Sequence, residues 1–143
     1  YWAYPEAQVG YYWSGSYIYL MAQEFKPTSN ILRKVKVRWG NEVEIRTDNS
    51  GQPSSVILTS ADKDDGSPEN SVIFPGPVTL VPGNSYWIVM HNRWVAYTYP
   101  DASDVYPGIA SMGSIDGGNT WFSTMPPPVP SLPVIDSDFI TYY

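Results

Sequence analysis

Four carboxylates lie close together in the polar segment "DKDDGSPE", which contains Asp62, Asp64, Asp65 and Glu69. Hard cations such as Ca²⁺ are bound by several oxygen donors on a flexible backbone, so these residues could supply a calcium site. Their spacing does not fit an EF-hand loop, and solvated turns have the same composition. We therefore expect a solvent-exposed acidic loop, with calcium binding as the alternative and no other cofactor.

A group of aromatic residues, Trp94, Tyr97 and Tyr99, could bind a ligand. In an extended segment Tyr97 and Tyr99 share one face and Trp94 lies on the other. Aromatic faces stack on sugar rings, which makes a glycan the candidate ligand. Packing within the protein is the alternative that we favour, because each aromatic side chain buries about 150–250 Å².

Residues for nucleophilic catalysis are few. His91 is the single histidine and the chain has no cysteine. A Ser-His-Asp site needs a presented nucleophile and an oxyanion hole, and no G-x-S-x-G turn is present. The carboxylates lie mostly in turns, where capping accounts for them, although the sequence leaves a paired-carboxylate glycosidase open. We predict that the protein is not an enzyme.

The composition is that of a folded globular protein, with 43% hydrophobic and 15% charged residues among 143. A net charge of −6 argues against nucleic acid as a partner. The one basic cluster, at positions 33–38, has the spacing of a solvated strand face. No apolar run is long enough for a membrane span.

Apolar residues recur with a period of two, which predicts β-strands. Residues 16–25 are apolar on both faces, so we expect a strand that is covered on both sides. Residues 34–39 and 42–46 alternate strictly, and the second segment places Glu42, Glu44 and Arg46 toward solvent. The first face is basic and the second mostly acidic, which favours two adjacent antiparallel strands.

Further short strands are expected along the rest of the chain. "VIF" (72–74) and "VTL" (78–80) are read as two strands separated by "PGP". Residues 86–90 are predicted to form a hairpin with 93–100, and His91-Asn92 its turn. The spacing of about ten short strands, with no substantial helix, predicts an all-β protein with an antiparallel β-sandwich.

Two turn motifs carry structural rather than chemical predictions. In "LVPGNSYWIVM", Pro82-Gly83 makes a turn and Tyr86 is placed to bond its hydroxyl back to that turn, as in a tyrosine corner. "SIDGGNTW" (114–121) resembles the Asp box of sialidases and other extracellular β proteins. That resemblance implies that Asp116 accepts hydrogen bonds from turn amides and that Trp121 packs beneath the hairpin.

Taken in order, five segments resemble the β-sandwich modules of secreted and surface-anchored bacterial and archaeal proteins, of the choice-of-anchor type, and of some virus particle proteins. They are "AQEFKPTSNILRKVKV", "VEIRTDNSGQPSSVI", "VTLVPGNSYWIVM", "SIDGGNTW" and "SDFITYY". The resemblance implies a non-catalytic, jelly-roll-like sandwich that lies outside the cell, on its surface or on a virus particle. The first 21 residues and the short "RWGNE" link depart from the pattern.

We divide the chain into an N-terminal aromatic extension, 1–16, and a β-sandwich domain, 17–143. Because position 1 is not Met, we expect the chain to be cut from a longer one, by maturation or truncation. The extension is expected to dock on a neighbouring subunit, since Tyr and Trp are favoured at interfaces. Its candidate contact residues are Tyr1, Trp2, Tyr4, Tyr11, Tyr12 and Trp13.

Two functions follow from these features. The first is a structural subunit of a filament, coat or other surface assembly, whose partners are copies of itself or other surface proteins. The second is a carbohydrate-binding or adhesive module of a larger secreted protein, whose partners are glycans.

Overall fold

The structure is a computed structural model, and it describes residues 9–12, 19–37, 42–63, 71–92, 95–98, 111–123 and 139–143. Regular structure in these ranges is entirely β-strand, which confirms the predicted all-β class for this part of the chain. No helix that could span a membrane occurs in these ranges. The strands are β1 (Val9–Tyr12), β2 (Tyr19–Phe25), β3 (Ile31–Val37), β4 (Glu42–Asp48), β5 (Pro53–Asp62), β6 (Ser71–Thr79), β7 (Tyr86–Asn92), β8 (Val95–Thr98), β9 (Ser111–Ser114) and β10 (Phe139–Tyr142).

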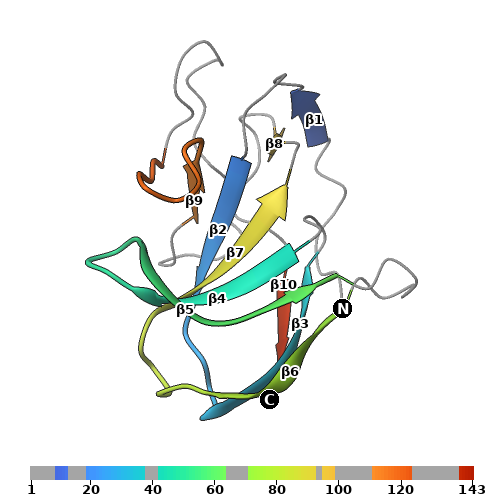
Figure 1. The fold of residues 1–143 in the computed structure, drawn as a ribbon, viewed down its shortest axis with the longest axis vertical. Coiled ribbons are helices and arrows are strands. Elements are labelled where there is room, and N and C mark those ends of the chain that lie inside the picture. The colour runs from blue at the N-terminus through green and yellow to red at the C-terminus, as the bar shows by residue number, and fades with distance from the viewer. Residues whose placement is uncertain are drawn as a thin grey trace.

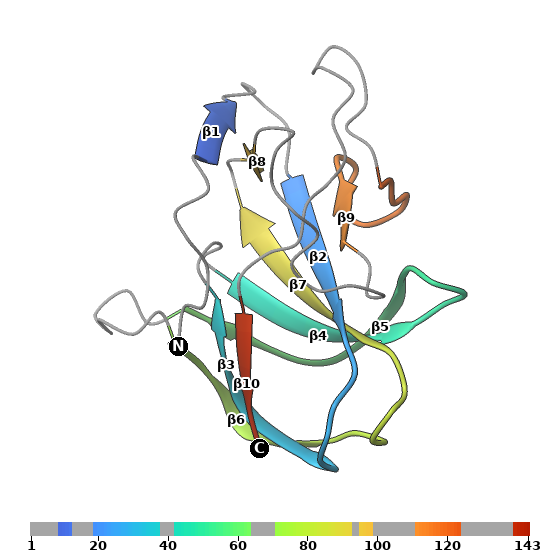
Figure 2. The same cartoon turned by 180° about the vertical axis from the view of Figure 1, so that it is seen from behind.

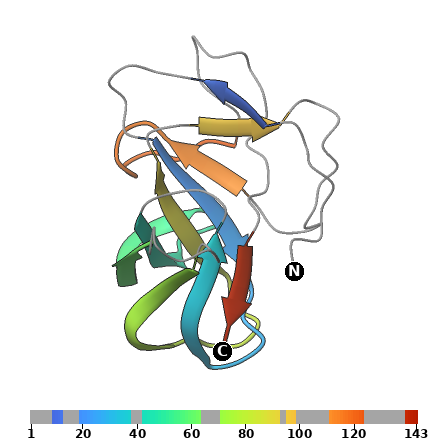
Figure 3. The same cartoon turned by 90° about the vertical axis from the view of Figure 1, so that its right-hand side faces the viewer.

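Two antiparallel sheets form the body of the molecule (Figure 1 and Figure 2). The larger has the order β5-β4-β7-β2-β9 and the smaller the order β10-β3-β6. A separate pair, β1 and β8, lies at the end of the molecule opposite the C-terminus (Figure 3). The arrangement is consistent with a β-sandwich, in which two sheets bury their facing sides against each other.

The main core lies between these two sheets. In β3, Val35 and Val37 are fully buried, whereas Lys34 and Lys36 face the other way and hold their ammonium groups 4.3 and 5.6 Å from the ring centre of Tyr142. The alternation predicted for this segment is confirmed over residues 34–37. The buried residues of this core are Met21, Phe25, Leu32, Val35, Val37, Val43, Ile45, Val72, Phe74, Val78, Leu80, Tyr86, Ile88 and Met90.

A second, smaller apolar cluster covers the outer face of the five-stranded sheet. It contains Leu20, Ala22, Trp87 and Val89, which are all buried. Because β2 also contributes residues to the main core, this strand is buried on both faces, as its mixed apolar pattern predicted. The outer face of the five-stranded sheet is therefore buried at its strands β2 and β7.

Two predictions about β4 are wrong. This strand is not adjacent to β3, because β3 belongs to the three-stranded sheet and β4 pairs with β5 and β7. Glu44 and Arg46 do not face solvent either, since each is only 6% exposed. The polar face of β4 points away from the main core, and the turn that follows β9 packs against Arg46 on that face.

Two strand assignments also need correction. "VIF" and the first two residues of "VTL" belong to one strand, β6. Its register against β3 shifts between Leu32 and Lys34, where β6 has an irregularity that includes Pro75 and Pro77, while Phe74 stays buried in the main core. A bulge accommodates prolines, which have no N–H for the ladder. His91 and Asn92 lie within β7 rather than in a turn, and β8 pairs with β1 instead of β7.

Candidate functional site

The turn after β9 is held together by the Asp116 carboxylate. Its oxygens accept hydrogen bonds from the Thr120 N–H at 2.9 Å, the Thr120 hydroxyl at 2.5 Å and the Ser114 hydroxyl at 2.8 Å. These hydrogen bonds, led by the one from the Thr120 side chain, lower the pKa of the carboxyl to about 2. Gly117 and Gly118 have φ of 74° and 92°, a left-handed backbone that favours glycine. Asp116 therefore accepts a hydrogen bond from an amide of its own turn, as predicted, and we call residues 114–121 the Asp-box turn after the motif that they resemble.

This turn lies against the outer face of the five-stranded sheet. A Cβ atom added at Gly118 would lie 3.0 Å from Arg46 Nη1 and 3.3 Å from Leu20 Cδ1. Trp121 packs on the second apolar cluster, and its ring centre lies 5.9 Å from the Arg46 guanidinium carbon. Arg46 is therefore confined between the sheet and the turn, in the distance range of a cation–π contact.

A buried ion pair occupies the same face. The Glu44 Oε2 atom accepts from Arg46 Nε at 2.6 Å and lies 2.6 Å from Arg46 Nη2. Glu44 Oε1 lies 2.9 Å from His91 Nε2. Each oxygen of this carboxylate thus has its own nitrogen partner, which is the condition under which a charge can be buried.

The electrostatics of this group favour the charged forms. Burial raises the pKa of the Glu44 carboxyl, but the hydrogen bonds and charges of His91 and Arg46 outweigh burial and hold it below its usual value. The hydrogen bond to Glu44 raises the pKa of the His91 imidazole, against the opposing effect of burial.

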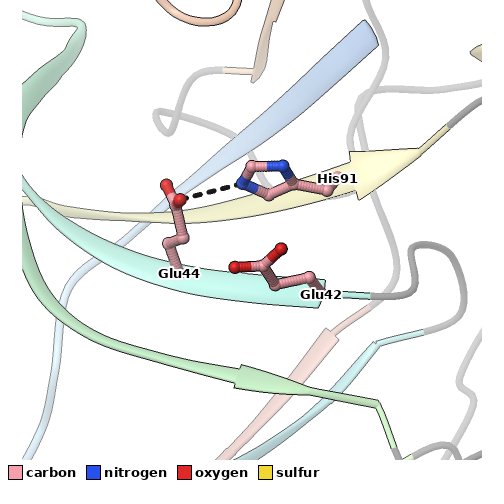
Figure 4. A group of neighbouring side chains, drawn as sticks. All are labelled: Glu42, Glu44 and His91. Carbon is pink, nitrogen blue, oxygen red and sulfur yellow. Dashed lines mark hydrogen bonds and ion pairs between the residues drawn. The ribbon is translucent and has the colours of Figure 1, made fainter. Parts of the chain in front are cut away.

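Glu42 completes a group of possible metal ligands, shown in Figure 4. It lies directly opposite His91 in the β4–β7 register, and Glu44 follows two residues later on the same face. One donor atom each from Glu42, Glu44 and His91 can be chosen so that all lie within 4.8 Å of one another. We call these three residues the Glu-Glu-His cluster.

The predicted structural residues lie as follows. The Tyr86 hydroxyl accepts a hydrogen bond from the Val81 N–H at 3.0 Å, the geometry of a tyrosine corner. Asp116 binds its own turn, and Trp121 is packed beneath it.

Most of the other predicted site residues lie outside the described residues. Of the four candidate calcium ligands only Asp62 is described, as an exposed residue at the end of β5. Tyr11 and Tyr12 lie in β1, and Tyr97 lies in β8 as the register partner of Gly10. The residues outside the described ranges are Asp64, Asp65, Glu69, Tyr1, Trp2, Tyr4, Trp13, Trp94 and Tyr99.

Sequence reasoning missed the Glu-Glu-His cluster. It assigned His91 to a turn and the two glutamates to a solvated face, so nothing connected them. The available signal was the spacing of Glu42 and Glu44, two residues apart on a strand, together with the single histidine. That signal gains meaning only when the β4–β7 register is known.

Comparisons of the chain with protein-family models, with curated proteins and with solved structures found no match. The resemblance to surface and virus particle modules therefore stays a prediction.

Proposed function

We propose that the protein is a non-catalytic structural subunit of an assembly at a cell surface, in an extracellular filament or on a virus particle, and that copies of the chain contact one another through β5. One observation carries this proposal. Val56, Ile57 and Leu58, three consecutive residues of β5, are 54%, 48% and 39% exposed.

Strand geometry explains why three exposed neighbours support an interface. Successive side chains of a strand point to opposite faces, so a strand with one face on a core exposes every second residue. Residues 56–58 are exposed on both faces, at the edge of the five-stranded sheet. Contiguous apolar surface at a sheet edge marks an interaction site.

The local backbone favours contact through side chains over the addition of a strand. The register of β5 against β4 shifts twice, between Ile45 and Arg46 and again between Arg46 and Asp48. Such bulges interrupt the ladder of backbone groups that a new strand would need. We infer that the partner packs on the side chains of Val56, Ile57 and Leu58.

The edge of the smaller sheet has the same character. Ile73 of the terminal strand β6 is 69% exposed, and Pro75 and Pro77 of the same strand have no N–H to offer a further strand. Both sheets therefore end in a strand that is irregular in its backbone and apolar on its surface.

The surface or virion setting, the jelly-roll-like topology and the contribution of the aromatic extension are parts of the same proposal. They are supported by the five sequence motifs that follow one another in the expected order from Ala22 to Tyr143, and by the many aromatic residues among positions 1–16. A subunit of this kind needs no catalytic group.

Sedimentation velocity over a range of protein concentrations tests the proposal. We expect the parent chain to form larger species as its concentration rises, and Ile57→Lys to remain a monomer because a charge enters the contact. Asn84→Lys adds the same charge at an exposed polar position outside β5 and should associate like the parent. A parent chain that stays monomeric throughout, or equal association by both variants, would contradict the proposal.

A further inference from the structure

The Glu-Glu-His cluster lies on two central strands of a sheet. β4 and β7 are bonded to each other and each has a further neighbour, so the backbone that carries the three donors is fixed on both sides. Glu42 and His91 face each other across the pair, and Glu44 lies one step along the same face. Donors on rigid elements need little reorganisation to bind a ligand.

Glu42 is the member of the cluster whose carboxylate has room for a further bonding partner. Within the part of the chain that the structure describes, its half-buried carboxylate makes no hydrogen bond and no ion pair, and its charge helps to raise the pKa of the His91 imidazole. Arg46 is engaged with Glu44, and His91 is bonded to the same glutamate. Figure 4 shows the Glu42 carboxylate directed toward the space beside His91 and Glu44. An unpaired carboxylate next to a second carboxylate is stabilised by a cation.

We propose that this cluster binds a divalent transition metal of the zinc type, through Nε2 of His91, Oε1 of Glu44 and a carboxylate oxygen of Glu42. One imidazole nitrogen with two carboxylate oxygens is a donor set that Zn²⁺ accepts. Ca²⁺ prefers six to eight oxygen ligands and is disfavoured by the imidazole. None of its three residues belongs to the acidic segment 62–69, for which calcium binding was the alternative to a solvated loop.

The distances fit this assignment. Zinc bound at about 2.1 Å from each donor holds neighbouring donors about 3.4 Å apart in a tetrahedron. In the structure His91 Nε2 and Glu44 Oε1 are 2.9 Å apart, and the three donors all lie within 4.8 Å. Zinc takes the place of the proton that Nε2 and Oε1 share, which is released to water, and a small rotation of side chains brings the donors to bonding distance. The His91 side chain is 31% exposed, which leaves a path for the ion and a place for a water ligand.

Arg46 is a positioning residue in this arrangement. It binds Oε2 of Glu44 through Nε and Nη2, so Oε1 is the oxygen that points to His91. Outer hydrogen bonds of this kind orient a ligating carboxylate. The packing of Arg46 against Trp121 and Gly118 ties that orientation to the Asp-box turn.

Titration of the chain with Zn²⁺, without an affinity tag, tests the assignment by calorimetry and by ¹⁵N NMR of the imidazole. The chain has one histidine and no cysteine, so a metal-induced shift of the Nε2 signal is assigned without ambiguity. We expect one zinc ion to bind per chain and the Nε2 signal to move more than the Nδ1 signal. Binding without any change in the imidazole signals would overturn the proposal.

Three variants locate the ion. His91→Gln and Glu42→Gln should each weaken zinc binding by at least about tenfold, because each removes a ligand. Glu42→Gln is the safer variant for folding, since Glu42 makes no hydrogen bond in the described part of the chain. Asp62→Asn is the matched control, because Asp62 is the register partner of Glu42 on β5 but lies outside the cluster. Equal affinity in the parent chain and in both ligand variants would refute the site.

Discussion

Replacing Gly118 by Ala tests whether the Asp-box turn packs on the outer face of the large sheet. Gly118 has a φ of 92°, and a Cβ atom there would lie 3.0 Å from Arg46 Nη1. Gly117 is the matched control, because its φ is 74° and a Cβ atom there meets nothing within 4 Å. Both variants force a left-handed alanine, whereas Gly118→Ala also crowds the packed face.

The two effects can be separated by magnitude. A left-handed alanine costs about 1–2 kcal/mol, and overpacking of a filled site costs about 1–3 kcal/mol more. Loss of glycine also reduces the entropy of the unfolded chain by a similar amount in both variants, so that contribution cancels in the difference. We expect Gly118→Ala to lower the free energy of unfolding by about 1–3 kcal/mol more than Gly117→Ala, as measured by urea denaturation. Equal losses would refute the packing of the turn on Arg46.

Three other predictions concern buried or bonded polar groups. The pKa of Asp116 is lowered from 3.8 to about 2, so its contribution to stability is complete above pH 3.8 and is lost as the pH falls toward 2. Asp116→Asn should therefore be less stable than the parent at neutral pH and equal to it in strong acid. A difference in stability that does not change with pH would contradict this. Tyr86→Phe removes the hydrogen bond to Val81 and should lower the free energy of unfolding by about 1 kcal/mol. Glu44→Gln leaves Arg46 buried without its ion-pair partner and should lower it by about 3–5 kcal/mol. Chemical denaturation measures the last two, and a Glu44→Gln variant as stable as the parent would show that the pair is not buried.

Local alternation was enough to predict the class of structure and the buried faces of β2 and β3. Successive side chains of a strand point to opposite faces, so the positions of apolar residues indicate which faces are buried. Val35 and Val37 are buried on one face of β3, and β2, which is apolar on both faces, is buried on both. The turn chemistry of residues 114–121 was likewise legible, since Asp116, the two glycines and Thr120 interact within one short segment.

Pairing between distant strands could not be predicted in the same way. The short link after residue 37 suggested a hairpin, but β3 and β4 belong to different sheets. Arg46 is packed by the turn after β9, which lies far along the sequence. Alternation of polar residues indicates only that these side chains point away from the main core. Whether they are exposed to water depends on whether a later segment packs on them.

The Glu-Glu-His cluster also depends on pairing between distant strands. Glu42 and His91 meet because β4 and β7 pair in one particular register, and a shift of one residue would send His91 to the opposite face from Glu42. The charges that adjust the pKa values of Glu44 and His91 come from residues brought together by that pairing.

Methyl NMR spectra recorded over a dilution series test most directly whether β5 is a contact between copies of the chain. The methyl signals of Val56, Ile57 and Leu58 should shift with protein concentration, while those of the buried Val43 and Ile45 should stay in place. Signals at 56–58 that remain constant as larger species form, or that move no more than the core methyls, would contradict the proposed assembly surface.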